Sequence, residues 1–354
     1  MKKKVLHIIS SVHWRGGEQQ VQYLLQDEST AFEYYLFCPE NAELIKRNPV
    51  KQERIFTYKK RFGADLFAAF QLKKICATQQ IDLLHLHDTH SLQTFWLADL
   101  LGMHLPAVLH RHVSFPVFSK WKYKHPQLKK IICVSAVIKQ YFSGFIADQQ
   151  LELIPPGIDV KKFAAFTDTS ILRKEINIRE EGRIIGMVAA LEKEKNIDEF
   201  LEIAYRYSKL HPQDQFVLIG EGSLMQSFKT QYNLSNLHFM GFRNHIETLL
   251  PSFDVFLFTS KNEGFGQVLL EAMASKVPIV CANFPAAAES IQDGKTGFIY
   301  KDIHHAVQLI EHLRTTNDLR FTTIENAYHF VQQFDVTLMN EKIEEVYQSV
   351  FKHA

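Results

Sequence analysis

The chain has 354 residues, of which 46% are hydrophobic and 22% charged, and its formal net charge is +1. This length exceeds one ordinary core and the composition is typical of a soluble globular protein, so we expect two domains. The balanced charge gives no argument for nucleic acid as a partner. The apolar stretch after the basic N-terminus is too short for a signal peptide. The sequence contains no run of 18 apolar residues, the length that a membrane-spanning helix needs.

Short apolar runs alternate with helical patterns along the first part of the chain. Strands are predicted at residues 5–9, 35–38, 83–86, 107–109, 131–134 and 151–154, and helices at residues 18–26, 66–77, 91–100 and 136–145. This alternation is typical of right-handed βαβ units and a parallel sheet. A Pro-Pro-Gly sequence at residues 155–157 interrupts the pattern.

A second set of alternating elements follows. Strands are predicted at residues 184–188, 216–219, 237–240, 255–258, 279–281 and 298–300, and helices at residues 197–207, 223–232, 266–275, 306–314, 319–333 and 336–351. The whole pattern predicts an α/β protein with two doubly wound, Rossmann-like parallel-sheet domains facing across a cleft. Such folds bind ligands at the carboxyl ends of their strands.

Two glutamates eight residues apart, Glu263 and Glu271, flank a turn made of Gly264, Phe265 and Gly266. Glycines let backbone N–H groups approach a ligand closely, and the start of a helix favours an anion. Carboxylates accept hydrogen bonds from hydroxyl groups. The layout of acid, phosphate cradle and acid suits a nucleotide-sugar; the structural alternative is a helix-capping acid followed by a solvated glutamate.

Residues 254–297 resemble the donor-binding segment of the retaining glycosyltransferases of the GT-B fold, in the group 1 family. The resemblance rests on the E-x(7)-E pattern, a proline-led strand at Pro278 and the D-G-x-T-G sequence from Asp293. It covers essentially the whole chain. It implies an acceptor-binding domain at residues 1–157, a nucleotide-sugar-binding domain at residues 158–335, and a C-terminal helix at residues 336–354 that packs back toward the first domain.

The resemblance also implies contacts to the donor phosphates. Gly16 and Gly17 follow the first predicted strand, where the family has a Gly-Gly turn that approaches the donor; a simple tight turn is the alternative. Lys195 matches the family's phosphate-binding lysine and would place a compact cation there. Ala190 stands where the family has an arginine, so one expected phosphate contact is missing.

Two further turns are implied to lie beside the base and ribose. One contains Gly220 and Glu221, and the other contains Arg243. Nothing in these residues distinguishes uracil from guanine, so a UDP- or GDP-linked sugar is expected as substrate. An ordinary turn is again the alternative.

The histidines at predicted strand ends need separate interpretation. The family has a histidine beside the reacting sugar at the position of His110, which we prefer to His112 for this role. His85 and His87 lie on one face of a strand, which raises the question of a metal, but no third ligand can be identified. The resemblance makes His87 and Asp88 residues of the acceptor side instead.

No Asp-x-Asp motif occurs in the sequence. We therefore expect no metal site and no cofactor, with Lys195 and helix N-termini meeting the charge of the leaving group. The four scattered cysteines are typical of buried side chains in a reducing cytoplasm.

Aromatic and basic residues alternate at residues 115–130, and residues 58–62 repeat the theme. Such segments bind anionic lipid surfaces, which would place the protein peripherally at the inner face of the membrane. A solvated loop face is the alternative, and nucleic acid is a weaker one.

These observations predict a retaining, metal-independent glycosyltransferase that moves a sugar from a nucleoside-diphosphate sugar to a saccharide or lipid-linked acceptor, in cell-surface polysaccharide or lipopolysaccharide biosynthesis. Glu263 and His110 would act at the sugar and Glu271 at the ribose. The alternatives are a glycoside hydrolase or phosphorylase using the same cleft, and a non-catalytic nucleotide-sugar-binding scaffold. Lys276 replaces a helix-ending glycine, so that helix end is expected to differ.

Overall fold

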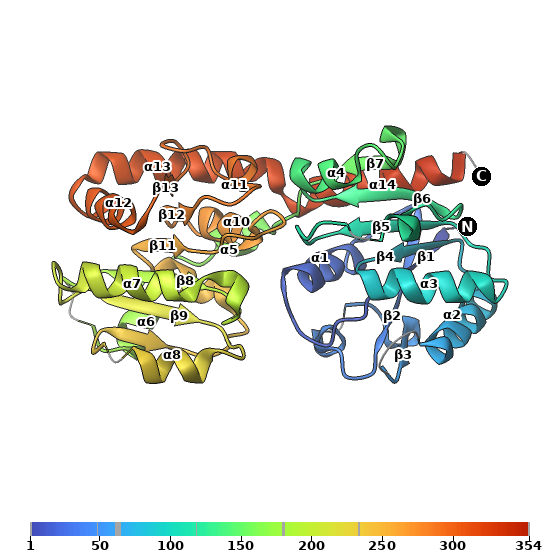
Figure 1. The fold of residues 1–354 in the computed structure, drawn as a ribbon, viewed down its shortest axis with the longest axis horizontal. Helices are drawn as coiled ribbons and strands as arrows, with labels where there is room; N and C mark the ends of the chain where they lie inside the picture. The colour runs from blue at the N-terminus through green and yellow to red at the C-terminus, as the bar shows by residue number, and fades with distance from the viewer. Residues whose placement is uncertain are drawn as a thin grey trace. The chain divides into compact units, whose positions relative to one another are not determined.

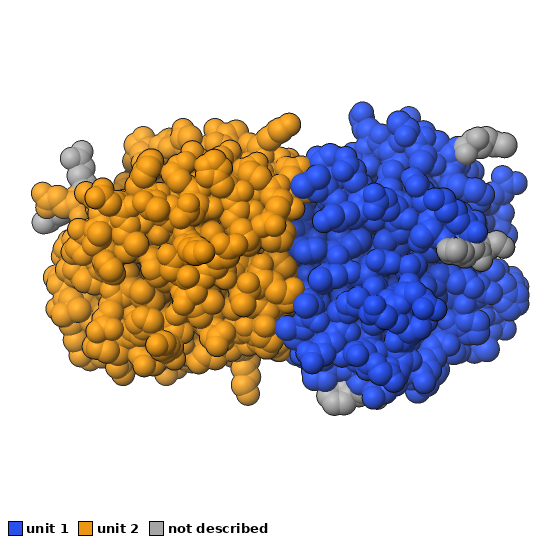
Figure 2. All heavy atoms as spheres, turned by 90° about the horizontal axis from the view of Figure 1, so that it is seen from above, with its two compact units in different colours: residues 1–157, 336–354 blue, residues 158–335 orange. Residues whose placement is uncertain are grey.

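The computed structural model describes residues 2–47, 49–60, 65–117, 119–178, 181–232 and 234–352. The chain forms two compact units (Figure 1, Figure 2). Unit 1 consists of Met1–Gly157 and Val336–Ala354, and unit 2 consists of Ile158–Asp335.

Unit 1 contains a parallel sheet. In its described residues seven strands lie in the order β3-β2-β1-β4-β5-β6-β7. They are β1 (Lys3–Ile8), β2 (Phe32–Pro39), β3 (Ile55–Tyr58), β4 (Leu83–Leu86), β5 (Ala107–Arg111), β6 (Leu128–Cys133) and β7 (Leu151–Leu153). The strand order reverses between β1 and β4. The loops that follow these two strands therefore run to opposite sides of the sheet and leave a topological switch point between them. The sequence predicted all of them except β3, a short and partly exposed edge strand.

Helices cover both faces of this sheet. They are α1 (Gly16–Leu25), α2 (Leu66–Gln79), α3 (Thr89–Leu100), α4 (Ala136–Phe142) and α14 (Val336–Lys352). The last helix lies beside α1 although more than 300 residues separate them in sequence (Figure 1). Its residues Met339, Ile343 and Tyr347 follow a helical period and pack into the core that contains Val5 and Val21.

Unit 2 has a second parallel sheet. Across its described residues the strand order is β10-β9-β8-β11-β12-β13, with a reversal between β8 and β11. The strands are β8 (Ile184–Val188), β9 (Gln215–Ile219), β10 (Leu237–Phe239), β11 (Val255–Phe258), β12 (Ile279–Ala282) and β13 (Phe298–Tyr300). The prediction of two doubly wound parallel sheets is confirmed.

The helices of unit 2 include several that the sequence did not predict. They are α5 (Val160–Ala164), α6 (Ser170–Glu175), α7 (Ile197–Ser208), α8 (Met225–Gln231), α9 (Ile246–Leu249), α10 (Gln267–Ala274), α11 (Ala287–Ser290), α12 (Ile303–Thr315) and α13 (Asn317–Val331). Those missed are α5, α6, α9 and α11, which are too short to show a helical period.

Single 3₁₀ turns complete the structure. They are η1 (Glu43–Arg47), η2 (Gln52–Arg54), η3 (Lys120–Tyr123), η4 (Asp148–Gln150), η5 (Lys193–Lys195), η6 (Leu250–Ser252) and η7 (Gln332–Phe334). Among the helices that the structure describes, none is both long enough and apolar enough to span a lipid bilayer.

The chain leaves unit 1 at a buried hydrogen-bonded position. The amide of Gln20 on α1 donates to the carbonyl of Gly157 at 2.9 Å and accepts from its N–H at 2.8 Å. Within unit 2, the N–H of Ile158 donates to the carbonyl of Phe334 at 2.9 Å. The outgoing and returning segments are therefore fixed in each unit by specific hydrogen bonds.

Candidate functional site

Two loops meet at the switch point of unit 2, where the carboxyl ends of β8 and β11 lie side by side. The hydroxyl of Thr259 donates to the carbonyl of Lys195 at 3.2 Å, and that of Ser260 donates to the carbonyl of Glu194 at 3.2 Å. The amide of Asn196 donates back to the carbonyl of Thr259 at 3.3 Å. These bonds fix the two loops against each other at the place where doubly wound sheets bind ligands.

The loops bring Lys195 and Glu263 into contact. The ammonium of Lys195 donates to Oε1 of Glu263 at 2.6 Å. The Lys195 side chain is 27% exposed and the Glu263 side chain 15% exposed, so the pair is partly shielded from water. The two residues predicted at the phosphate and at the sugar are therefore neighbours, and each charge is balanced by the other.

The glycine turn after Glu263 starts α10. Gly266 adopts a left-handed conformation with φ of 85°, which suits glycine best, and no side chain caps this helix N-terminus in the described structure. The first N–H groups of a helix attract anions. Phe265 is buried with its ring 5.4 Å from that of Phe334, so it anchors the turn and leaves ligand contacts to the backbone.

Glu271 lies on α10, one turn beyond its start, and is only 8% exposed. A solvated helix residue would be far more accessible. The structural alternative for Glu271, a glutamate on a hydrated helix face, is therefore wrong.

The loops after β9 and β10 lie beside the loop after β8. Gly220 has φ of 140°, and a Cβ on it would be 1.9 Å from the carbonyl oxygen of Ala189. Its N–H donates to the carbonyl of Gly241 at 2.9 Å, and Glu221 is exposed at the end of β9. Arg243, in the next loop, forms an ion pair with Glu175 of α6, so its predicted contact with the nucleotide would have to compete with this pair.

The switch point of unit 1 is organised around Asp88. Its carboxylate accepts from the N–H of Ser10 at 2.7 Å, from the hydroxyl of Ser10 at 2.8 Å and from the N–H of Ser91 at 2.7 Å. These bonds join the loop after β1 to the start of α3. Gly16 and Gly17 begin α1, directly after the loop that follows β1. Burial of the neighbouring Glu18, together with the charge of Asp88, raises the pKa of Glu18.

His110 does not stand alone at its strand end. It is 1% exposed, and its ring stacks on that of His112 at 4.0 Å and lies 5.9 Å from that of His87. Two groups of three histidines have ring nitrogens within 4.8 Å of one another: His7 with His85 and His87, and His87 with His110 and His112. The sequence could not identify a third histidine beside His85 and His87, because it does not show which strands are neighbours; the structure places His7 there.

Comparison with known proteins identifies the family. The family described as "Glycosyl transferases group 1" matches residues 168–330, and the family described as "Glycosyltransferase Family 4" matches residues 14–162. Together they cover most of both units. The chain belongs to the group 1, family 4 glycosyltransferases.

Relatives of this glycosyltransferase are distant in sequence. It is 27% identical over 315 residues to the Escherichia coli UDP-Gal:alpha-D-GlcNAc-diphosphoundecaprenol alpha-1,3-galactosyltransferase, covering 80% of this chain and 79% of the other. It is 24% identical over 318 residues to the Acholeplasma laidlawii alpha-monoglucosyldiacylglycerol synthase, covering 80% and 77%. The crystal structure of Anabaena HepE in complex with UDP and glucose has a TM-score of 0.84 at 18% identity, covering 98% of this chain and all of that one, which confirms the GT-B fold.

The glycosyltransferase has a polar cluster beside its Lys195–Glu263 pair that the sequence did not indicate. Glu199 on α7 accepts from the amide of Asn196 at 2.7 Å and from the hydroxyl of Tyr300 at 2.8 Å, and it pairs with Lys261. Burial alone would raise the pKa of Glu199, but these hydrogen bonds outweigh it and the pKa is lowered. No motif marks Glu199, so only the packing of α7 against the loop after β11 shows its place.

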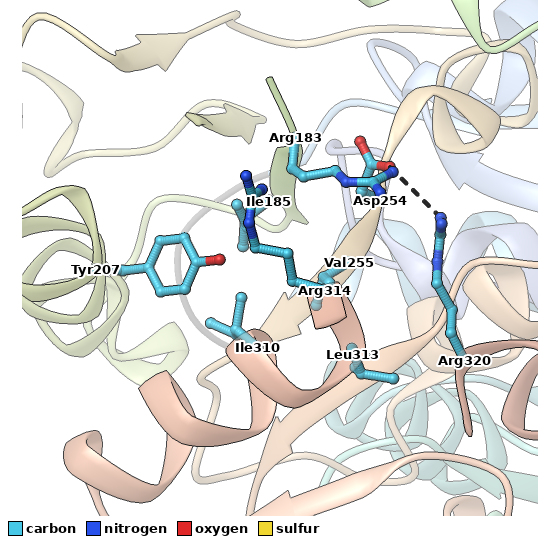
Figure 3. A pocket seen from close by; sticks show the side chains of 9 residues that line it. All are labelled: Arg183, Ile185, Tyr207, Asp254, Val255, Ile310, Leu313, Arg314 and Arg320. Carbon is cyan, nitrogen blue, oxygen red and sulfur yellow. Dashed lines mark hydrogen bonds and ion pairs between the residues drawn. The ribbon is translucent and has the colours of Figure 1, made fainter. Parts of the chain in front are cut away.

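A small pocket of the transferase lies at the amino-terminal edge of the unit 2 sheet (Figure 3). There the carboxylate of Asp254 accepts from Arg173 at 2.6 Å and from Arg183 at 2.8 Å, and Arg320 lies 3.5 Å away. Arg183 and Asp254 directly precede β8 and β11, while Arg173 lies on α6 and Arg320 on α13. This edge is not where doubly wound sheets bind ligands, so the cluster is an internal ion network.

The C-terminal end of α10 corrects one expectation. Lys276 takes the left-handed conformation with φ of 57°, and the N–H of Val277 donates to the carbonyl of Ala272 at 2.9 Å as in a glycine-ended helix. Left-handed backbone costs a non-glycine residue roughly 1 kcal/mol or more. The Lys276 ammonium lies 4.6 Å from the ring of Tyr328, a contact that offsets part of this cost, so the helix end is unchanged.

Proposed function

We propose that this transferase moves a sugar from UDP to a lipid-linked saccharide with retention of anomeric configuration, and without a metal ion at the diphosphate. The observation that carries the proposal is the Lys195–Glu263 pair, 2.6 Å long, beside the uncapped N-terminus of α10 in the described structure. The pair places a cation, a carboxylate and helix N–H groups together at the carboxyl ends of β8 and β11.

In this proposal the diphosphate binds the ammonium of Lys195 and the first N–H groups of α10. The carboxylate of Glu263 then orients sugar hydroxyls, and Glu271 accepts hydrogen bonds from the ribose. Phosphate binding competes with Glu263 for Lys195, so donor entry releases the carboxylate for the sugar.

The chemical step would pass through an oxocarbenium-like transition state. The bond from the anomeric carbon to the phosphate oxygen breaks, and the acceptor oxygen bonds to that carbon on the same face. The departing phosphate oxygen takes the acceptor proton, while Lys195 and helix N–H groups stabilise its charge. His110 has a lowered pKa because it is buried, so it is neutral and can hydrogen-bond a sugar hydroxyl.

The choice of UDP and of a lipid-linked acceptor draws on the relatives. The Escherichia coli relative is named for UDP-Gal and a diphosphoundecaprenol acceptor, and the Acholeplasma laidlawii relative for a glucosyldiacylglycerol. The Anabaena HepE structures contain UDP or UDP-glucose. These names support an activated sugar on UDP and an acceptor that carries lipid.

Unit 1 has exposed apolar side chains that suit a lipid surface. Leu66, Phe67 and Phe70 are exposed at the start of α2, and Trp121 is 61% exposed in η3 with the Lys122 ammonium 6.0 Å from its ring. Aromatic and cationic side chains of this kind are favoured at membrane interfaces.

Other parts of the predicted basic segments are less available. Lys60 donates to the carbonyl of Ser10 at 2.7 Å, and Lys130 is paired with Glu152 at 2.6 Å. Arg61, Phe62 and Phe118 of those segments lie outside the described residues. The α2 start and η3 therefore carry the membrane proposal.

Thermal shift with UDP, GDP and their free nucleosides tests the donor. A ligand that binds only the folded protein stabilises it by about 2.7 kcal/mol at 100 times its Kd, so a larger shift with UDP than with GDP supports the proposal. Transfer from radiolabelled UDP-sugars to a lipid-linked saccharide tests the reaction. UDP binding without transfer to any acceptor supports a scaffold, and hydrolysis of a glycoside without nucleotide supports a glycosidase.

A further inference from the structure

Five histidines lie on one face of the unit 1 sheet. His7 of β1 is in register with His85 of β4, and His110 lies two residues beyond the β5 partner of His85. Side chains alternate along a strand, so His87 projects to the same face as His85. His112 follows β5, and its ring stacks on that of His110. The histidines thus form one continuous group on three neighbouring strands.

The same face is otherwise apolar. Val5, Leu83 and Val108 precede the histidines on β1, β4 and β5 and pack into the core with α1 and α14. The described neighbours of the five rings include Tyr34 and Tyr347, which contact His7 and His85. Hydrophobic side chains would fill this layer without polar atoms, so five imidazoles here call for a reason beyond packing.

Several of their ring nitrogens have no protein partner. Nδ1 of His85 contacts the hydroxyl of Tyr347 at 2.5 Å, and Nδ1 of His7 contacts Nε2 of His87 at 3.0 Å. Among the described residues no hydrogen bond reaches His7 Nε2, His85 Nε2, His87 Nδ1, both nitrogens of His110 or His112 Nε2. Buried polar atoms are normally satisfied, so this group points to a ligand that takes nitrogen lone pairs.

The His7–His87 contact prevents the two sets of three from binding ions at the same time through their partner-free nitrogens. A neutral imidazole carries one proton, so one ring of the pair donates and the other accepts. If His87 donates through Nε2, its Nδ1 keeps a lone pair, and His7 must carry its own proton on Nε2. His87 Nδ1 and His7 Nε2 therefore cannot both be metal ligands while this hydrogen bond persists.

We propose that His87, His110 and His112 form a binding site for a divalent transition metal ion of the zinc type. Each offers a nitrogen without a protein partner, and their ring nitrogens lie within 4.8 Å of one another. Three imidazoles suit zinc, copper or nickel and leave a fourth position for water or another ligand. The His112 residue is half-buried, and its partner-free Nε2 is buried.

The three proposed ligands are neutral imidazoles. Burial, together with the charge of Arg111, lowers the pKa of His112 to about 4, and burial lowers the pKa values of His87 and His110 well below their usual value. The Arg111 guanidinium is the charged group that acts on His112, and a Cβ on Gly17 would lie 3.8 Å from the His112 ring.

The test uses the full-length protein freed of metal by a chelator. Isothermal titration with Zn²⁺ should show one ion per chain, and Co²⁺ should give the visible absorption bands of tetrahedral nitrogen coordination. Zinc X-ray absorption on the wild-type protein should show nitrogen ligands at about 2.0–2.1 Å and no sulfur. Absence of binding, or sulfur ligation, would overturn the proposal without need of any variant.

Variants then identify the ligands. The double substitution His87→Gln with His112→Gln should weaken Zn²⁺ binding on the order of 100-fold or more, since even outer-shell partners are worth 10–100-fold. His104→Gln, an exposed histidine of the same unit, is the matched control and should bind as wild type. His7→Gln should change affinity by no more than a few fold. If binding survives the double substitution, or is lost with His7→Gln alone, the assignment of these three ligands is wrong.

Discussion

The ammonium of Lys195 lies 2.6 Å from the carboxylate of Glu263 and joins the loop after β8 to the loop after β11. The pair couples the residue expected at the phosphate to the residue expected at the sugar. Donor binding would replace the Glu263 carboxylate by the diphosphate as the hydrogen-bond partner of Lys195. Substituting Lys195 and Glu263 one at a time should therefore have different kinetic effects.

Lys195→Met should weaken binding of UDP roughly 10- to 100-fold, because a charge-assisted hydrogen bond is worth about 1.5–3 kcal/mol. Glu263→Gln should leave UDP affinity within a few fold, because the proposed partner of Glu263 is the reacting sugar and not UDP. It should lower kcat on the order of 100-fold, because the lost interaction is made at the reacting sugar. Lys193→Met, at an exposed neighbour in η5, is the control. Titration calorimetry and initial rates measure both; equal losses of affinity in the two variants would contradict the division of roles.

Glu271→Gln should weaken binding of UDP and of uridine by similar factors, since a ribose contact is common to both. The loss of a charged acceptor predicts a change of about 1.5–3 kcal/mol. Glu202→Gln, at a half-buried glutamate of α7 that pairs with Arg206, controls for a general effect of removing a carboxylate. An unchanged affinity for UDP in a folded Glu271→Gln protein would remove the ribose role.

Much of the fold was predictable because buried parallel strands have continuous apolar runs, as at residues 255–258. The edge strand β3 was missed because it is partly exposed. At the site, the sequence indicated Lys195 and Glu263 separately, but they are 68 positions apart in sequence and only the adjacency of β8 and β11 shows the pair. The histidine cluster was hidden for the same reason, since His7, His85 and His110 come from strands whose order the sequence does not state.

His110→Gln should lower turnover on the order of 100-fold if this residue contacts the sugar, whereas His112→Gln should have a smaller effect. Both rings are in the same stack, so thermal unfolding must first show that each variant is folded. His104→Gln again provides an exposed control. A larger loss of kcat for His112→Gln than for His110→Gln would transfer the catalytic role to His112, the more exposed of the two.

Incubation with EDTA should leave transferase activity intact. The sequence has no Asp-x-Asp pair to hold a divalent ion on the diphosphate, and Lys195 supplies positive charge there instead. An ion bound by His87, His110 and His112 would engage the His110 ring that is proposed to contact the sugar. Its removal by EDTA would leave that ring free for the sugar, so turnover should not fall. Activity that is lost in chelator and restored by Mg²⁺ or Mn²⁺, measured as initial rates, would show that the diphosphate does need a metal.

The protein should bind anionic vesicles, and binding should weaken as salt is added. Each lysine near an anionic surface is worth about 1 kcal/mol, and exposed charges are screened within about 8 Å at physiological ionic strength. Liposome flotation at low and high salt measures this.

Two variants separate the apolar and basic contributions to that binding. Phe67→Ser with Phe70→Ser removes exposed apolar side chains from α2, and Lys120→Gln with Lys122→Gln and Lys124→Gln removes the charges around η3. Both should reduce flotation, the second only at low salt. Lys209→Gln in unit 2, where the Lys209 ammonium lies 4.0 Å from the ring of Tyr205, is a control for loss of a surface lysine beside an aromatic ring. If neither variant changes flotation, or the wild-type protein ignores anionic vesicles at low salt, these surfaces are ordinary solvated faces and the acceptor reaches unit 1 from solution.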